Sequence, residues 1–219
     1  MDKLRLRFEK TGRAVYISHL DLMRTMQRAF SRAGYELKYS EGFNPHPQIS
    51  IILPLSVGTA SFCELMDFRL KGEAELDRLP AELTAVLPEG VRVTQVYEQT
   101  RKSAELKWLE IEGLFEYDER DTAEMAKELE AFFAQEQIKV MRKTKRGMGE
   151  ADIRPAIREL CFSPVEDGVR LRGIISAQEP TLNPELLAEA LRQKQPSAAP
   201  DFAKFTRLET YDGQLQIYR

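Results

Sequence analysis

The same order of strand-like and helix-like segments occurs twice along the 219-residue chain, and this repetition constrains the fold more than any other feature of the sequence. In the first half, "KLRLRFEK" alternates charged and apolar residues, which predicts a strand with one buried face. Ser18 and Asp21 have the spacing of a capping box, which predicts the start of a helix. Strands in "QISIILPL" and "FCELMDFRLK", a helix near residue 80 and a strand in "VRVTQVYEQ" complete a βαββαβ order. This order is typical of the ferredoxin-like fold, an antiparallel sheet with both helices on one face.

The second half repeats the order without obvious residue identity. A strand in "LKWLEIEGLFEY" precedes a helix that Asp121 caps, and "QIKVMRKTKRG" and "IRELCFSPVEDGVRLRGIISA" supply further strands. Asn183 and Pro184 predict the start of the last helix, and "FTRLETYDGQLQIYR" predicts a terminal hairpin. We therefore expect an α+β protein of two tandem ferredoxin-like (βαββαβ) halves with antiparallel sheets, over residues 1–100 and 105–219.

Charge is distributed unevenly along the chain. The formal net charge of −3 argues against a uniformly basic nucleic-acid-binding protein. Residues 1–38 nevertheless hold nine Lys or Arg against four Asp or Glu, and residues 137–158 hold seven against two. The stretch 105–136 is acidic, with eleven Asp or Glu against three Lys or Arg. This pattern predicts a protein that binds a polyanion on one face only.

In the first half, the candidate anion-binding residues lie on the first strand and the first helix. Lys3, Arg5 and Arg7 alternate with apolar residues, so we expect them to line the open face of the sheet, away from the helices. An open basic sheet is a common RNA-binding surface. Arg24 and Arg28 are four residues apart and share one face of the helix. Solvated charged faces would also account for both sets, so both interpretations stay open.

In the second half, a denser basic block occupies an expected loop at 139–147. Five of these nine residues are basic, and they lead into Gly147 and Gly149. Glycine-rich backbone beside cationic side chains can hold one phosphate with both amides and charges. We expect anion binding here, with a mobile charged hairpin loop as the alternative. The candidate residues are Lys139, Arg142, Lys143, Lys145, Arg146 and, a little further on, Arg154.

The chain has two histidines, His19 and His46. His46 lies in "YSEGFNPHPQIS", where the prolines on either side favour an extended, rigid path. We interpret this segment as a recognition frame made of Tyr39, Ser40, Phe43, Asn44 and His46. Whether the two histidines share a site is open, and hydrogen-bonded structural histidines are the alternative. Without nearby cysteine or carboxylate ligands, they predict no metal site.

Several classes of protein lack support in the sequence. It contains no Walker loop, G-x-S-x-G, H-E-x-x-H, Rossmann glycine pattern or three-cysteine cluster. Cys63 and Cys161 each lie beside a phenylalanine in strand-like sequence, so we expect both to be buried free thiols. No run approaches the roughly 18 apolar residues of a membrane span, and charges occur throughout residues 1–20. We therefore expect a cytoplasmic protein without membrane contact.

The strings "YISHLDLMR", "YSEGFNPHPQISIILPLSVG", "LPEGVRV" and "DIRPAI" resemble the bacterial radical SAM-linked protein family. This family is a domain of unknown function that is fused to, or encoded beside, a B12-binding-type radical S-adenosylmethionine protein. The resemblance covers nearly the whole chain and is strongest at residues 13–58. It implies a radical SAM enzyme as partner. That partner would carry an iron–sulfur cluster, S-adenosylmethionine and, in the B12-binding class, cobalamin, whereas no cofactor is expected on this chain.

The resemblance also bears on function. Genes of the family often lie near those for an RNA-processing nuclease and ribosomal proteins, which implies a role in RNA or ribosome modification, with tRNA or ribosomal RNA as the ligand. The leading hypothesis is a non-catalytic RNA-binding accessory protein with no DNA preference. One alternative is a metal-independent RNA endonuclease in which His19 or His46 is the general acid or base. The other is a protein–protein adaptor that binds no RNA.

Overall fold

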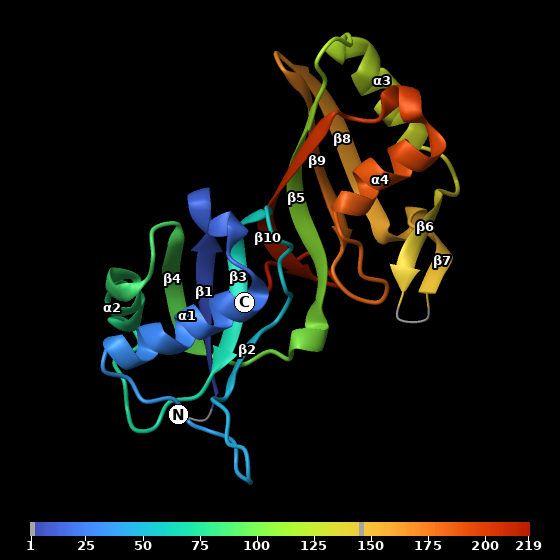
Figure 1. Ribbon diagram of the computed structural model, residues 1–219. Helices are drawn as coiled ribbons and strands as arrows, with labels where there is room; N and C mark the ends of the chain where they lie inside the picture. Colours follow the sequence, from blue (N-terminus) through green and yellow to red (C-terminus); the bar gives the residue numbers. More distant parts are fainter. Residues whose placement is uncertain (1–2, 145–146) are drawn as a thin grey trace. The chain divides into compact units, whose positions relative to one another are not determined.

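Two units make up the part of the chain that the computed structural model describes, residues 3–144 and 147–219 (Figure 1). The first unit comprises residues 1–105 with Arg219, and the second comprises residues 106–218. The described residues contain four α-helices, and the paired strands given below are all antiparallel. The fold is therefore of the mixed α+β class.

The first unit contains a sheet in the order β4-β1-β3, with β2 paired to β3. Its elements are β1 (Leu4–Lys10), α1 (His19–Arg32), β2 (Ile49–Ile51), β3 (Ala60–Phe68), α2 (Leu79–Val86) and β4 (Val91–Glu98). The alternation in β1 predicts the buried face correctly, because Leu4, Leu6 and Phe8 join one hydrophobic cluster with α1 and α2. Both helices therefore cover the same face of this sheet (Figure 1).

Local signals set the ends of these elements. Ser18 Oγ accepts a hydrogen bond from Asp21 N (3.2 Å), which confirms the predicted cap of α1. The turn before β4 requires a glycine, since Gly90 has a φ of +86° and an added Cβ would lie 2.3 Å from Thr11 O. Thr11 N donates to Gly90 O (2.7 Å), so this close approach joins the turn to the end of β1.

The second unit contains a sheet in the order β10-β5-β9-β8 and a separate two-stranded ribbon, β6-β7. Its elements are β5 (Leu106–Glu116), α3 (Thr122–Phe133), β6 (Lys139–Thr144), β7 (Gly147–Asp152), β8 (Ile157–Val165), β9 (Gly168–Ser176), α4 (Glu185–Lys194) and β10 (Phe202–Asp212). Asp121 Oδ1 accepts from Glu124 N (2.8 Å), as the predicted cap of α3 requires. Helix α3 packs on β8 and β9, and α4 packs on β6 and β10 (Figure 1).

Two expectations for the second unit need correction. Residues 139–144 of the basic segment are not a loop but form β6, which pairs with β7 and agrees with the strand expected in "QIKVMRKTKRG"; Lys145 and Arg146 lie outside the described residues. Strand β7 was missed because "GMGEAD" is rich in glycine and lacks the β-branched and aromatic residues that favour strands. Cys161 is exposed rather than buried, whereas Cys63 is buried as expected.

Candidate anion-binding site

The predicted recognition frame forms a finger that projects from the first unit (Figure 1). An isolated bridge pairs Tyr39 with Pro47 across the two arms, and Ser40 N donates to His46 O (2.9 Å). Ser40 Oγ accepts from His46 N (3.1 Å) and lies 3.0 Å from His46 Nδ1. Gln27 of α1 donates from Nε2 to Tyr39 Oη (3.3 Å), which ties the finger to the helix. The imidazole is thus held on one edge and remains exposed.

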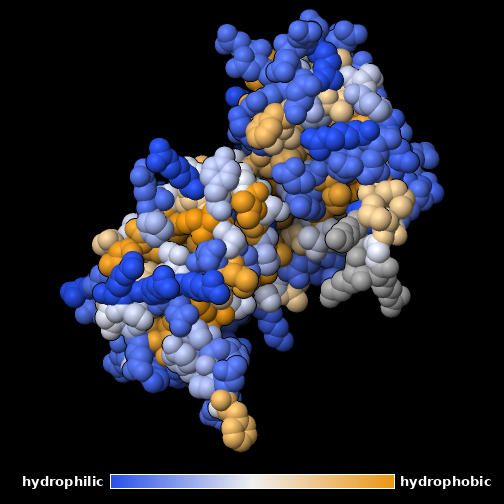
Figure 2. Space-filling model, viewed as in Figure 1, coloured by the Kyte–Doolittle hydropathy of each residue, from blue (hydrophilic) through white to orange (hydrophobic). Residues whose placement is uncertain are grey.

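The tip of the finger is shaped by glycine and carries an aromatic ring. Gly42 has a φ of +117°, a conformation that side chains other than glycine rarely adopt. Phe43 is fully exposed, at 112% of its reference surface, and Asn44 is exposed beside it. Figure 2 shows the tip as a hydrophobic projection below the first unit. An aromatic ring in this position is available to stack on a nucleobase.

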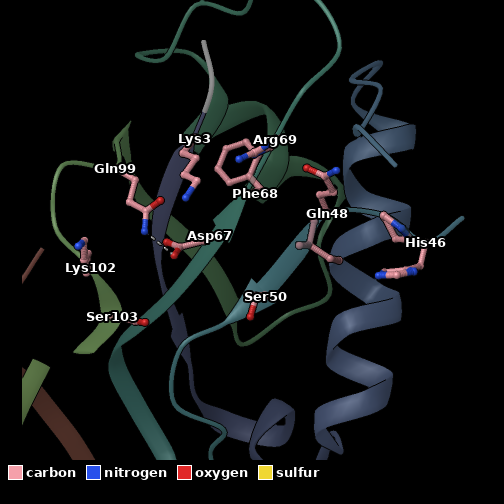
Figure 3. A pocket seen from close by; sticks show the side chains of 12 residues that line it. Lys3, His46, Gln48, Ser50, Asp67, Phe68, Arg69, Gln99, Lys102 and Ser103 are labelled. Atoms are coloured by element: carbon pink, nitrogen blue, oxygen red, sulfur yellow. Dashed lines mark hydrogen bonds between the residues drawn. The ribbon is translucent and has the colours of Figure 1, made fainter. Parts of the chain in front are cut away.

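A pocket of about 460 Å³ lies at the base of the finger, within the first unit (Figure 3). Its lining comes from the residue before β1, from β2 and the segment that leads into it, from the end of β3 and the residue after it, and from the segment after β4. The lining residues are Lys3, His46, Pro47, Gln48, Ile49, Ser50, Asp67, Phe68, Arg69, Gln99, Lys102 and Ser103. Figure 3 shows Lys3, Asp67 and Gln99 on one side and His46 with Gln48 on the other. The pocket therefore unites His46 and Lys3, which the sequence alone did not bring together.

The lining of this pocket is cationic. Lys3, Arg69 and Lys102 form no salt bridge with any residue in the described ranges 3–144 and 147–219. Asp67 is the one carboxylate in the lining, and its negative charge is paired with the positive charge of Arg5. Arg5 Nε donates to Asp67 Oδ1 (2.6 Å), and Gln99 Nε2 donates to Asp67 Oδ2 (2.9 Å). Three cations consequently line the cavity without a salt-bridge partner among the described residues, and only Lys102 has a carboxylate, that of Glu105, near enough to interact with its charge, which suits an anionic ligand.

The expectation that Arg5 lies on an open face of the sheet is wrong. Its side chain is fully buried, and its Nη2 donates to Asp67 Oδ2 (3.2 Å) and Arg101 O (3.0 Å). The antiparallel register places Arg5 opposite Asp67, and the sequence of β1 gives no sign of this partner. Arg5 thus influences the charge of the pocket lining, because it neutralises the carboxylate of Asp67.

The other predicted basic residues of the first unit lie outside the pocket lining. Arg7 is partly buried and donates from Nε (3.3 Å) and Nη2 (3.2 Å) to Phe62 O. Arg24 is exposed and pairs with Asp21 (3.2 Å) one helical turn away. Arg28 is exposed on the same helix. The helix stripe therefore remains a surface feature separate from the pocket.

His19 is the first residue of α1 and does not line the pocket around His46. No hydrogen bond found among residues 3–144 and 147–219 joins the two imidazoles. His46 therefore lines the candidate site, and His19 is not among the residues that line it.

In the second unit, the strand geometry divides the basic block of β6 between two faces. Lys139 and Met141 are exposed, whereas Val140 is buried and Arg142 is partly exposed. Lys143 belongs to β6 opposite Met148, and Lys145 and Arg146 lie outside the described residues. Arg154 donates from Nη1 to Ile157 O (2.8 Å), so it braces the turn before β8. The described part of the block does not gather its charges at one point.

Helix α4 holds the ribbon through one glutamine. Gln193 Oε1 accepts from Met141 N (2.8 Å), and Gln193 Nε2 donates to Met141 O (2.9 Å). The side-chain amide thereby imitates a neighbouring strand on the outer edge of β6.

Gln193→Ala should release the ribbon from α4 and destabilise it by about 1–2 kcal/mol, because two hydrogen bonds to one residue are lost. Hydrogen exchange measured by mass spectrometry should show faster exchange across 139–152 and unchanged exchange in β5 and β9. Arg192→Ala is the matched control, since it truncates the neighbouring, exposed side chain of α4, which pairs with Glu189 (3.6 Å), and keeps both bonds of Gln193 to Met141. Equal exchange in the wild type and Gln193→Ala would contradict this role.

The sheet of the second unit offers a different surface. Two ion pairs cross its strands, with Arg172 bonded to Glu110 (2.6 Å) and Lys204 bonded to Glu116. Arg170 is exposed two residues before Arg172 on β9 and has no salt bridge among residues 3–144 and 147–219, so the charges of this face are only partly paired.

Two further classes of site are not found in the described part of the chain. Residues 3–144 and 147–219 contain no cluster of three or more His, Cys, Asp or Glu side chains suited to a metal ion. No helix in these ranges has the length and apolar character to cross a membrane.

Three of the four charged residues in the pocket lining, Asp67, Arg69 and Lys102, were not predicted from the sequence. Arg69 follows β3 and Lys102 follows β4, so both are distant in sequence from Lys3 and His46. No motif links them. Only the pairing of β1 with both β3 and β4 brings these strand ends to one edge of the sheet. The available signal was the βαββαβ order itself, which predicts this adjacency once the strand order is assumed.

Comparisons with solved structures support the fold alone. A chain of a Cbf5–Nop10–Gar1 complex aligns with a TM-score of 0.53 and 7% identity, over 94% of this chain and 48% of that one. This chain therefore spans about half the length of that relative. An unknown protein from Galdieria sulphuraria (TM-score 0.29, 10% identity, 94% and 98% covered) and the acetolactate synthase small subunit from Thermotoga maritima (0.26, 12%, 97% and 98%) are too dissimilar for any argument.

Comparison with curated proteins gives no match. The profile of one family, described as an uncharacterized protein conserved in bacteria (DUF2344), matches residues 3–194. Because this match covers most of the chain, the protein belongs to the uncharacterized bacterial family DUF2344.

Proposed function

We propose that this protein is a non-catalytic RNA-binding accessory protein that acts with a radical SAM enzyme in the modification of tRNA or ribosomal RNA in the cytoplasm. RNA binding is supported by the pocket geometry. The partner is supported by the sequence resemblance in "YISHLDLMR" and "YSEGFNPHPQIS". On this proposal the partner supplies the iron–sulfur cluster, S-adenosylmethionine and cobalamin, and this chain supplies the grip on RNA.

The observation that carries the proposal is the set of cations around the pocket. Lys3, Arg69 and Lys102 line the same pocket and have no salt-bridge partner among the described residues, and the carboxylate of Asp67 in this lining is paired with Arg5. Lys3 and Lys102 are exposed and Arg69 is partly buried, so a phosphate group would meet these cations at the open surface of the pocket, where their attraction depends on salt. The exposed Phe43 ring on the adjoining finger adds a stacking surface of the kind that single-stranded RNA uses.

We also infer that each unit is a ferredoxin-like half. The strand orders β4-β1-β3 with β2, and β10-β5-β9-β8, both agree with that topology once the β6-β7 ribbon is treated as an insertion. This fold leaves one sheet face without helices. Such a face and the adjoining strand ends are where small RNA-binding modules hold their ligand.

The test is binding of fluorescent total tRNA and ribosomal RNA fragments across a salt series in EDTA. If three pocket cations contact phosphates, the slope of log Kobs against log salt concentration should be about −2 or steeper. The RNA should remain intact on a gel. Absence of binding at low salt would overturn the proposal and favour the adaptor hypothesis.

The position of His46 supports a second candidate, a metal-independent ribonuclease. A histidine that lines the same pocket as cations without salt-bridge partners can move a proton while the cations stabilise the phosphate in the transition state. In this case the same gel should show fragments in EDTA, and His46→Ala should abolish them while His19→Ala leaves them. Intact RNA with the wild-type protein would exclude this candidate.

A further inference from the structure

We propose that the pocket binds a phosphate monoester, such as the terminal phosphate of an RNA strand or the phosphate of a free mononucleotide. This inference rests on the proposed function, and it specifies which part of an RNA enters the pocket. The finger would then contact the nucleotide that carries the phosphate.

The polar groups of the pocket are mainly hydrogen-bond donors. The ammonium groups of Lys3 and Lys102 and the guanidinium of Arg69 have no acceptor capacity. The Asp67 carboxylate accepts from Arg5 and Gln99 (2.6–3.2 Å), so its lone pairs are largely used within the protein. A ligand that fits such a lining must bring acceptors and negative charge, as a phosphate does.

The number of cations favours a monoester over a diester. A phosphodiester inside an RNA strand carries one negative charge, whereas a terminal monoester carries about 1.5 to 2 at neutral pH. Three unpaired cations and one neutralised carboxylate can compensate this larger charge. The additional charge should strengthen binding by roughly tenfold at low salt, because each nearby cation adds to the attraction.

The size of the pocket agrees with a nucleotide rather than a bare ion. Its volume of about 460 Å³ falls in the range of small-molecule sites, and a phosphate alone would fill a small part of it. His46 and Gln48 form the wall opposite Lys3 (Figure 3). The imidazole edge that Ser40 does not contact is therefore available to the sugar or base beside a bound phosphate.

The test compares RNA oligonucleotides of one sequence that end in a 5′-phosphate, a 3′-phosphate or hydroxyls only, together with AMP and adenosine as competitors. We expect one phosphorylated end to bind roughly tenfold more tightly than the hydroxyl form. AMP should compete where adenosine does not. The preference should disappear in Lys3→Gln/Lys102→Gln and persist in Arg78→Gln, which removes an exposed cation outside the pocket.

The outcomes separate this inference from the proposed function. Equal affinity for all three oligonucleotides, with no competition by AMP, would overturn the monoester site and leave RNA binding intact. If no RNA binds, titration calorimetry with AMP and with adenosine decides the matter: binding of AMP but not of adenosine would support the site and overturn the RNA-binding function. If AMP binds as tightly as the phosphorylated RNA end, the source of the phosphate is a free nucleotide.

Discussion

Asp67→Asn should lower the free energy of unfolding by about 3–5 kcal/mol, because it removes the carboxylate that faces a buried guanidinium. Arg5 is fully buried, and both Nε (2.6 Å) and Nη2 (3.2 Å) donate to Asp67. The guanidinium of an arginine does not lose its proton in proteins, so Arg5 would stay charged and buried without its carboxylate partner. Urea denaturation followed by circular dichroism measures the loss, and hydrogen exchange should assign it to β1 and β3.

Two variants make this prediction specific. Arg5→Met/Asp67→Leu should recover most of the lost stability, since replacing both members of a buried pair with apolar residues is often neutral. Glu36→Gln breaks the exposed Lys71–Glu36 pair and should cost at most about 1 kcal/mol. If Asp67→Asn costs as little as Glu36→Gln, the Arg5–Asp67 pair does not stabilise the first unit as we describe.

The elements of the fold were predictable where local chemistry decides the structure. The alternation in β1 and the caps at Ser18 and Asp121 depend on neighbours within four residues, and the structure confirms them. Strand β7 was not predictable, because its sequence disfavours a strand. The ribbon instead depends on α4, where Gln193 satisfies both backbone groups of Met141 from 52 residues away.

The candidate site was predictable only in fragments. The segment around His46 is exposed, and its arms are bridged at Tyr39 and Pro47, in agreement with the predicted frame. Lys3 was expected on the open face of the sheet, but it precedes β1 and lines the pocket at the strand ends. The role of Arg5 was not predictable, because alternation assigns a face but not a partner on the next strand. The register that sets Arg5 opposite Asp67 decides which of two similar arginines, Arg5 or Arg7, becomes an internal counter-ion.

The burial of Arg5 changes which surface of the first unit is expected to bind RNA. If Arg5 were exposed, the open sheet would be the natural RNA-binding face. Because Arg5 is buried and paired, the cations that remain near this edge of the sheet are Lys3, Arg69 and Lys102 at strand ends. We therefore expect the ligand to bind at the edge of the sheet, beside the finger, and not at the middle of the sheet.

Lys3→Gln/Arg69→Gln/Lys102→Gln should weaken RNA binding by about 100-fold at 0.1 M salt. Each phosphate contact to single-stranded RNA contributes about 0.7 to the slope of log Kobs against log salt concentration, so three contacts contribute about 2. Between 1 M and 0.1 M salt, a slope of this size raises log Kobs by about 2, which is the 100-fold affinity that the variant should lose. The three residues lie on the pocket surface and make no salt bridge with residues 3–144 or 147–219, so the fold should tolerate their neutralisation. Fluorescence anisotropy over a salt series measures both quantities, and circular dichroism checks folding.

The matched control is Lys71→Gln/Arg78→Gln/Arg92→Gln. It removes the same charge from the same unit, but each residue is paired with a carboxylate, namely Glu36, Glu75 or Glu9, and none lines the pocket. We expect the control to change the salt slope by less than about 0.5, because residues already paired with carboxylates release few counterions from RNA. Equal losses in both triple variants would mean that RNA responds to the net charge of the first unit and not to the pocket. An unchanged affinity in both would place the RNA-binding surface elsewhere, with the exposed Arg24 and Arg28 of α1 and the β6 strand as the remaining basic candidates.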